Sequence, residues 1–283
     1  MSRPDPADRH PHRDRTTEID VLVPTRGRPV ELATTLAGLA GQRGPAFRVV
    51  VSDQSDGQPS YATPAAETMA RVLRHQGRPV EFLRHLPRRG LAEQRHFLLG
   101  RARAEHVLFL DDDVWLEPDA LATMHRAIGE LGCGLVGMAV QGLSYLDDVR
   151  PHELVPYEEW TGRPEPEVLS VDSPAWQRMT LHNAANPTHL AERLNLAPGE
   201  WRAYKIAWVG GCVLYDRQAL VRAGGFGFWA ELPEEHAGED VLAQWRVMAK
   251  YGGAGILPSG AVHLEAPTTV VNRETEVTRV LPV

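Results

Sequence analysis

The stretch Phe109-Leu110-Asp111-Asp112-Asp113-Val114-Trp115 indicates most about the fold of this chain. It completes a short apolar run, His106–Leu110, and continues into three adjacent carboxylates. Such carboxylates repel one another unless a cation or hydrogen-bond donors compensate their charge. Mg²⁺ and Mn²⁺ prefer oxygen ligands and commonly take one or two carboxylates together with substrate phosphates. The stretch therefore predicts a buried strand that ends at a divalent-metal site; the alternative is that Asp112 and Asp113 face solvent in a loop.

Around this stretch, short apolar runs alternate with segments of helical periodicity. Strands are expected at Ile19–Val23, Phe47–Val51, Val80–Leu83, His106–Leu110 and Leu135–Val140. Helices are expected at Val30–Leu39, Thr63–His75, Leu91–Ala104 and Pro118–Leu131. Strands that are apolar on both faces and separated by helices indicate an α/β fold with a mostly parallel sheet flanked by helices. Such sheets bind ligands at the carboxyl ends of their strands, where Thr25, Asp53 and the three aspartates are expected to lie.

The pattern changes between Gln141 and Tyr204, where proline, tryptophan and mixed charge replace any sustained period. We interpret residues 141–204 as an insertion that shapes the substrate site within one domain over residues 18–266. The regular core resumes with a strand at Ile206–Tyr215, helices at Arg217–Ala223 and Glu239–Tyr251, and a strand at Ala254–His263. The polar, proline-containing segment 1–17 is expected to be disordered, and residues 267–283 to form a peripheral tail.

Composition excludes several classes of protein. The 283 residues carry a net charge of −7 and no long Lys/Arg block, so a nucleic-acid partner is not expected. No run approaches the ~18 apolar residues of a membrane-spanning helix. Cys133 and Cys212 lack the spacing of a zinc or redox motif, which favours two buried, reduced thiols and a reducing cytoplasm.

The acidic stretch resembles the D-x-D signature of the GT-A-fold, family 2 glycosyltransferases, which follows a strand reading F-L-D-x-D. Asp111 and Asp113 match the two aspartates. The resemblance implies a GT-A, Rossmann-like fold in which Asp113 coordinates Mn²⁺ or Mg²⁺ and Asp111 helps to hold the nucleotide ribose and the waters on the metal. Asp112 is assigned to the nucleotide-binding residues beside them.

Three further motifs carry the same resemblance. The segment VPTRGRP is similar to the family's P-T-x-N-R at Pro24 and Thr25, which implies a place in the nucleotide site. The segment VVVSDQSDG is similar to V-D-D-G-S, so Asp53 matches the aspartate that contacts the base, although Gln54 replaces a glycine. Arg95 matches the arginine of G-x-x-x-A-R-N and would face the nucleotide; the alternative is an arginine on the surface of a helix.

Three residues late in the chain complete the predicted site. Glu239 and Asp240 precede a helical pattern, where carboxylates cap a helix or serve as a general base. They match the family's E-D motif, which implies that Asp240 is the base, with Glu239 as a second catalytic candidate or acceptor ligand. His263 ends the last predicted strand, and the resemblance implies that it joins Asp111 and Asp113 at the metal; a structural role is the alternative.

The resemblance implies transfer of a sugar, with inversion, from a nucleoside-diphosphate sugar to an acceptor hydroxyl. The donor is expected to be UDP-linked, and the acceptor a small molecule, a glycan or a lipid-linked compound. Two alternatives stay open. A sugar-phosphate nucleotidyltransferase would need a G-x-G-T-R-type loop that VPTRGRP lacks. A catalytically inert nucleotide-sugar-binding protein would not need the acidic pair and the late histidine.

Overall fold

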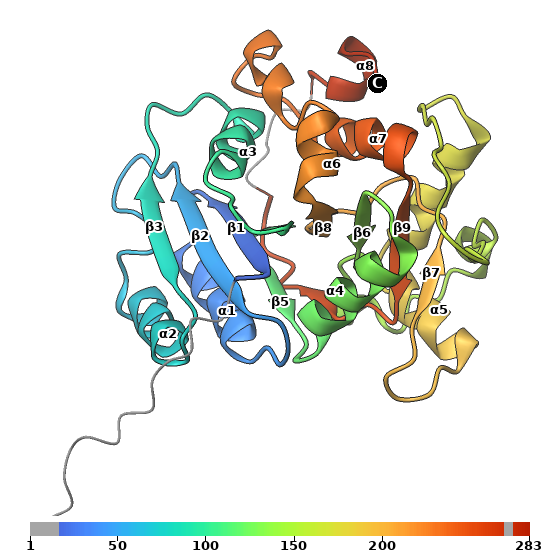
Figure 1. Cartoon of the computed structure of the whole chain (residues 1–283), viewed down its shortest axis with the longest axis horizontal. Helices are drawn as coiled ribbons and strands as arrows, with labels where there is room; N and C mark the ends of the chain where they lie inside the picture. The colour runs from blue at the N-terminus through green and yellow to red at the C-terminus, as the bar shows by residue number, and fades with distance from the viewer. Residues whose placement is uncertain (1–16, 269–273) are drawn as a thin grey trace, which may run out of the picture.

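The computed structural model describes residues 17–268 and 274–283, and its centre is a mixed eight-stranded sheet. The strand order is β3-β2-β1-β4-β8-β6-β9-β7 (Figure 1). Strands β7 and β8 run antiparallel to their neighbours, and the other pairings are parallel. The expected mostly parallel α/β sheet is confirmed. Its strands are β1 Ile19–Thr25, β2 Phe47–Asp53, β3 Val80–Arg84, β4 His106–Leu110, β6 Leu135–Gly137, β7 Arg202–Tyr204, β8 Cys212–Asp216 and β9 Gly253–Leu257.

Helices cover both faces of this sheet, as the strands' doubly apolar character predicts. In β1, Val21 and Val23 pack on one side and Leu22 on the other, because successive side chains of a strand alternate. The first side is covered by α1 Pro29–Ala40, α2 Pro64–His75 and α4 Ala120–Leu131; the second is covered by α3 Leu91–Leu99, α6 Arg217–Arg222 and α7 Glu239–Tyr251.

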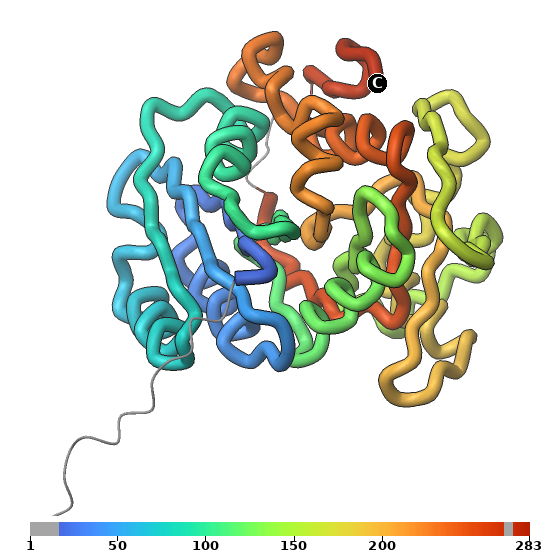
Figure 2. The backbone as a smooth tube through the Cα atoms, viewed as in Figure 1, coloured from blue at the N-terminus to red at the C-terminus, as the bar shows by residue number. Residues whose placement is uncertain are grey.

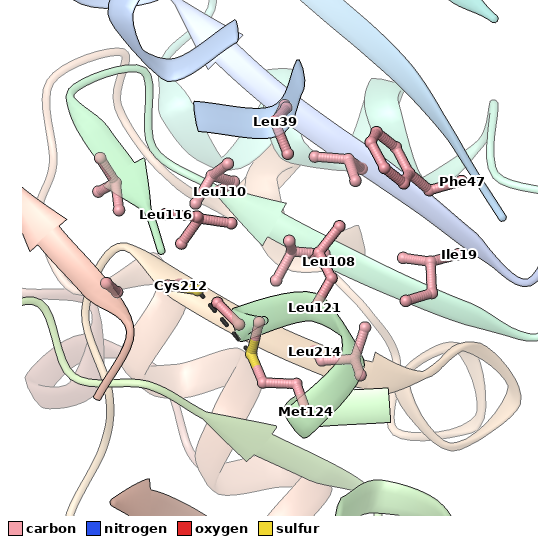
Figure 3. Packing of buried hydrophobic residues seen from close by; sticks show 14 of the residues in the cluster. Ile19, Leu39, Phe47, Leu108, Leu110, Leu116, Leu121, Met124, Cys212 and Leu214 are labelled. Carbon is pink, nitrogen blue, oxygen red and sulfur yellow. Dashed lines mark hydrogen bonds between the residues drawn. The ribbon is translucent and has the colours of Figure 1, made fainter. Parts of the chain in front are cut away.

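The core under α4 shows how closely one face is packed. Leu108 and Leu214, from neighbouring strands, belong to the same buried cluster as Leu121 and Met124 of α4 (Figure 3). The thiol of Cys212 lies 3.9 Å from the Met124 sulfur. Both cysteines are buried and unpaired, as expected, and burial raises the pKa of the Cys212 thiol to about 12.

A second, two-stranded sheet was not anticipated. It pairs β5 Val114–Leu116 with β10 Ala261–His263 in antiparallel register, so that His263 lies opposite Val114. The single strand predicted at Ala254–His263 is therefore wrong. Strand β9 ends at Leu257 because Pro258 has no N–H to continue the ladder, and the chain then enters the other sheet. This change of sheet brings the end of the late strand next to the three aspartates.

The segment 141–204 is only partly an insertion. It contains three 3-10 helices, η1 Leu143–Tyr145, η2 Pro151–Leu154 and η3 Pro174–His182, and the helix α5 Asn186–Leu194. Its end, however, forms β7, which pairs with β9 at the edge of the central sheet. A three-residue strand is too short to show a period in the sequence, and the central sheet therefore resumes at Arg202, before the predicted boundary near residue 204.

Four other helix and strand boundaries differ from the predicted ones by several residues. The helix predicted to reach Ala104 ends at Leu99, before Gly100, and the strand predicted from Ile206 begins only at Cys212. The strand predicted to reach Val140 ends at Gly137, and the helix predicted from Pro118 begins at Ala120. Among the described residues, no helix is long and apolar enough to cross a bilayer.

The C-terminal residues are not a peripheral tail. Residues 274–283 contain α8 Val277–Val280, which packs against α7 (Figure 2). The backbone N–H of Ala237 donates to Thr275 at 3.0 Å, and the N–H of Val277 donates back to Ala237 at 2.9 Å. The segment is thereby fixed beside the start of α7. The expected disorder of residues 1–17 falls almost wholly outside the described residues.

Candidate active site

The carboxyl ends of β1, β2 and β4 lie side by side, as the parallel pairing requires. Thr25 is directly opposite Asp53 in the register of β1 and β2, and β4 leads into the three aspartates. A cavity of about 380 Å³ opens over this edge. Residues from both ends of the chain line it, among them Pro24, Thr25, Arg28, Gln54, Asp111, Asp112, Asp113, His236 and His263.

Asp112 and Asp113 are buried and paired with donors. Only 6% of Asp112 and 5% of Asp113 is exposed, so the alternative that both face solvent is wrong. Asp112 accepts hydrogen bonds from the Thr25 hydroxyl at 2.6 Å and from Arg28 at 3.1 Å. The same Arg28 nitrogen is 2.5 Å from Asp113 Oδ2. The repulsion expected among these carboxylates is therefore offset by a guanidinium group and a hydroxyl.

Arg28 is a site residue that the sequence reasoning missed. Its guanidinium also donates to the backbone carbonyl of Pro267, so it connects the end of β4 to the segment after β10. The available signal was its position in VPTRGRP, where it matches the arginine of P-T-x-N-R. A motif indicates that such an arginine is present, but not which carboxylates it contacts.

The pKa values of the two buried aspartates, Asp112 and Asp113, are shifted in opposite directions. Burial, together with the charge of Asp113, raises the pKa of Asp112 to about 7 against the bonds from Thr25 and Arg28. Burial would raise the pKa of Asp113 as well, but His263 and Arg28 outweigh it and hold that pKa below its usual value. Asp113 is thus the carboxylate kept ionised at neutral pH.

Asp113 and His263 fit two positions in the shell of a divalent ion. Asp113 Oδ2 and His263 Nε2 are 3.4 Å apart, and neighbouring ligands of an octahedral ion are separated by about 3 Å at bond lengths of about 2.1 Å. The described residues contain no cluster of three His, Cys, Asp or Glu side chains suited to a metal ion. Phosphate oxygens and water would have to complete the shell, which is common for Mg²⁺.

Asp111 forms an ion pair with Arg95. The Arg95 guanidinium donates to Asp111 at 3.0 Å and to Glu239 at 3.1 Å. Arg95 is buried, so the alternative of a surface arginine is wrong. The pKa of Arg95 is raised: the charges of Asp111 and Glu239 outweigh its burial, which alone would lower it. Arg95 therefore joins the acidic stretch to the start of α7.

A second cavity of about 670 Å³ adjoins the first, and Leu91, Asp111, His263 and Thr268 line both. Asp240 lines only the second cavity, where its carboxylate accepts the N–H of Val241 at 2.9 Å. Burial, followed by the charge of Glu239, raises the pKa of Asp240 to about 7. Glu239 is buried and ion-paired with Arg95, so Asp240 is the more accessible of the two carboxylates.

The wall of the second cavity comes largely from residues that the sequence did not indicate. Trp208 lies against Gly210, whose missing Cβ would be 3.1 Å from the indole ring. Trp176 packs edge-on against the core residue Trp245. Within the described residues, neither the Trp176 nor the Trp208 ring N–H has a hydrogen-bond acceptor, whereas Trp245 donates to Ala207. The C-terminal segment adds Glu276, Thr278 and Arg279 to this wall.

Asp53 does not line either cavity. It is fully buried, and its two carboxylate oxygens accept the backbone N–H groups of Ser55 and Ser60, each at 2.7 Å. These bonds hold the loop after β2 in place. The structure therefore positions Asp53 behind the cavity and Gln54 at its wall.

Comparisons with known proteins agree with this architecture. The model of the family "Glycosyl transferase family 2" matches residues 20–184, and the chain belongs to that family. Among solved structures, residues 1–349 of S. aureus TarS superpose with a TM-score of 0.55 and 17% identity, covering 87% of this chain and 60% of that chain. No curated protein sequence matches the chain.

Two ligand-bound structures share the fold. The mannosyltransferase PcManGT from Pyrobaculum calidifontis, in complex with GDP-Man and Mn²⁺, has a TM-score of 0.54 and 18% identity, covering 91% of this chain and 60% of that chain. S. aureus TarS 1–349 in complex with UDP-GlcNAc has a TM-score of 0.52 and 17% identity, covering 90% and 60%. The chain thus spans about 60% of the length of these neighbours.

Proposed function

We propose that this protein is a metal-dependent glycosyltransferase that moves a sugar from a nucleoside-diphosphate sugar to an acceptor hydroxyl with inversion. One observation carries the proposal. Two cavities meet at Asp111 and His263, with an ionised carboxylate at the wall of the first and a carboxylate of raised pKa at the wall of the second. This arrangement suits a diphosphate on one side of the reacting carbon and an attacking hydroxyl on the other.

Different residues of the chain would have different roles in the proposed reaction. Asp240 accepts the proton of the acceptor hydroxyl while the hydroxyl oxygen bonds to the anomeric carbon, and the bond from that carbon to the diphosphate breaks. The nucleoside diphosphate leaves with the electron pair. A Mn²⁺ or Mg²⁺ ion held by Asp113 and His263 would offset the charge on the diphosphate. Arg95 keeps Glu239 and Asp111 in place beside the reacting centre.

The donor is proposed to be UDP-linked, and a small molecule, a glycan or a lipid-linked compound remains the proposed acceptor. The solved neighbours are bound to UDP-GlcNAc in one case and GDP-Man in another, which supports a nucleotide sugar without selecting one. The two free, buried thiols fit the reducing cytoplasm as the place of action.

The test of the proposal is product analysis with Mn²⁺ and a panel of UDP-, dTDP- and GDP-sugars. The expected products are the nucleoside diphosphate together with either a glycosylated acceptor or, if water replaces the acceptor, the free sugar. A nucleotidyltransferase would instead leave these nucleotide sugars unchanged and would release pyrophosphate in a parallel assay that supplies a nucleoside triphosphate and a sugar 1-phosphate. An inert binding protein would give no product although a nucleotide raises its melting temperature, and Asp240→Asn would then change nothing measurable.

A further inference from the structure

The loop after β2 contains a fully buried carboxylate, Asp53, that is bonded to the backbone of its own loop. Both oxygens of Asp53 accept backbone N–H groups, from Ser55 and Ser60. Asp53 is also 0% exposed, so its carboxylate has no surface at which a base in the cavity could donate a hydrogen bond. Its side chain also lies outside the residues that line the 380 Å³ cavity.

Gln54, the next residue, is arranged differently. It is buried, lines the cavity, and donates through its amide nitrogen to Glu93 at 3.3 Å. Glu93 is itself held by His85 Nε2 at 2.8 Å. Because a carboxylate only accepts hydrogen bonds, the contact with Glu93 fixes which end of the amide is nitrogen. The amide oxygen of Gln54 is left without a donor among the described residues.

We propose that Gln54 is the residue that selects the base of the donor, and that it selects a pyrimidine-2,4-dione, uracil or thymine. This inference rests on the proposed function and names its donor class. The free amide oxygen accepts the N3–H of the imide. Cytosine has an unprotonated N3 and would bring two acceptors together. Guanine presents two adjacent N–H donors, which suit a carboxylate, but Asp53 and Glu93, the two carboxylates beside Gln54, do not line the cavity.

The first measurement uses the unaltered protein, so it does not depend on a variant that folds. Isothermal titration in the presence of MnCl₂ compares UDP, dTDP, CDP, GDP and UDP methylated at N3. UDP is expected to bind roughly tenfold or more tightly than CDP, GDP and the N3-methylated compound, because each of these leaves a buried group unpaired. dTDP carries the same imide, and its affinity shows whether thymine is accepted beside uracil. GDP or CDP binding as tightly as UDP would overturn the inference.

The second measurement compares Gln54→Met with Gln58→Met, the same change at an exposed position of the same loop. Gln54→Met is expected to reduce the ratio of UDP affinity to CDP affinity by roughly tenfold, while Gln58→Met leaves it unchanged. Asp53→Asn is expected to lower the melting temperature and to leave the ratio within twofold, on the order of experimental scatter.

Two failures are distinguishable. If the unaltered protein binds none of these nucleotides, the proposed function fails and this inference fails with it. If UDP binds, but the ratio of UDP affinity to CDP affinity falls in Asp53→Asn and is unchanged in Gln54→Met, only the assignment of Gln54 is wrong.

Discussion

At the scale of single residues, Asp240 links the structure to a pH profile. Its pKa is raised to about 7 by burial and by the neighbouring charge of Glu239, and a base must be deprotonated to act. We expect kcat/KM for transfer to rise with pH up to about 7 and then to level off. Asp240→Asn should lower the rate by roughly 10²–10⁴-fold. A rate that is flat between pH 5 and 8 would argue against Asp240 as the base.

The raised pKa of Asp240 also affects folding stability, which can be measured without an activity assay. The folded state binds the Asp240 proton more tightly than the unfolded state, so folding stability falls as pH rises from about 4 to about 7. Above that range the buried charge remains a cost. Asp240→Asn should therefore melt at a higher temperature than the unaltered protein at pH 8, and this gain should disappear near pH 4.

Arg28 provides a second test at this scale. Arg28→Met would leave the buried Asp112 and Asp113 without their guanidinium, and removing one partner of a buried ion pair costs about 3 kcal/mol. Arg26→Met is the control, because the Arg26–Asp56 pair is exposed and screened by solvent, so its loss should change the free energy of unfolding much less. Urea denaturation measures both. Equal losses in the two variants would show that Arg28 does not neutralise the aspartates.

At the scale of elements, the start of α7 is fixed against the C-terminal segment. Gly238, before the first residue of α7, has φ +84°, and a Cβ there would be 2.0 Å from the Glu276 carboxylate. Gly224 has φ +100°, but a Cβ there would meet only the end of the Arg246 side chain, at an ordinary contact distance of 4.0 Å. Both Gly→Ala changes should cost about 1 kcal/mol from backbone strain.

Only Gly238→Ala should also displace Glu276 or the start of α7. We expect it to lower kcat for transfer at least tenfold, roughly the cost of a small misplacement in a catalytic site, with UDP affinity retained. Gly224→Ala should keep its activity. If the two variants transfer sugar equally well, the C-terminal segment does not position the base.

At the scale of the whole molecule, the 380 Å³ cavity collects residues from segments far apart in the chain, so a nucleotide bound there should stabilise the fold as a unit. A ligand at 100 times its Kd stabilises the folded state by about 2.7 kcal/mol. We expect UDP with Mn²⁺ to raise the melting temperature, and EDTA to reverse most of the shift. The His263→Ala variant should lose the Mn²⁺-dependent part and keep the rest; full retention would place the ion elsewhere.

The sequence by itself determined the elements whose signals are local. Apolar runs on both faces predicted β1, β2, β3 and β4, and helical spacing predicted α1, α2, α4 and α7 within a few residues. Charge crowding at Asp111–Asp113 and a known motif indicated an acidic site at strand ends. The predicted elements were confirmed because burial and periodicity act over a few neighbouring residues.

Only the tertiary structure decided which of those residues contact one another and which line the cavities. Arg28 pairs with Asp112 and Asp113, which are 84 and 85 positions away, and Arg95 pairs with Glu239 across 144 positions. Asp53 is turned to its own loop, and the C-terminal segment becomes a wall of the second cavity. No local pattern encodes such contacts, because they depend on which strands become neighbours and on where the chain returns after β9.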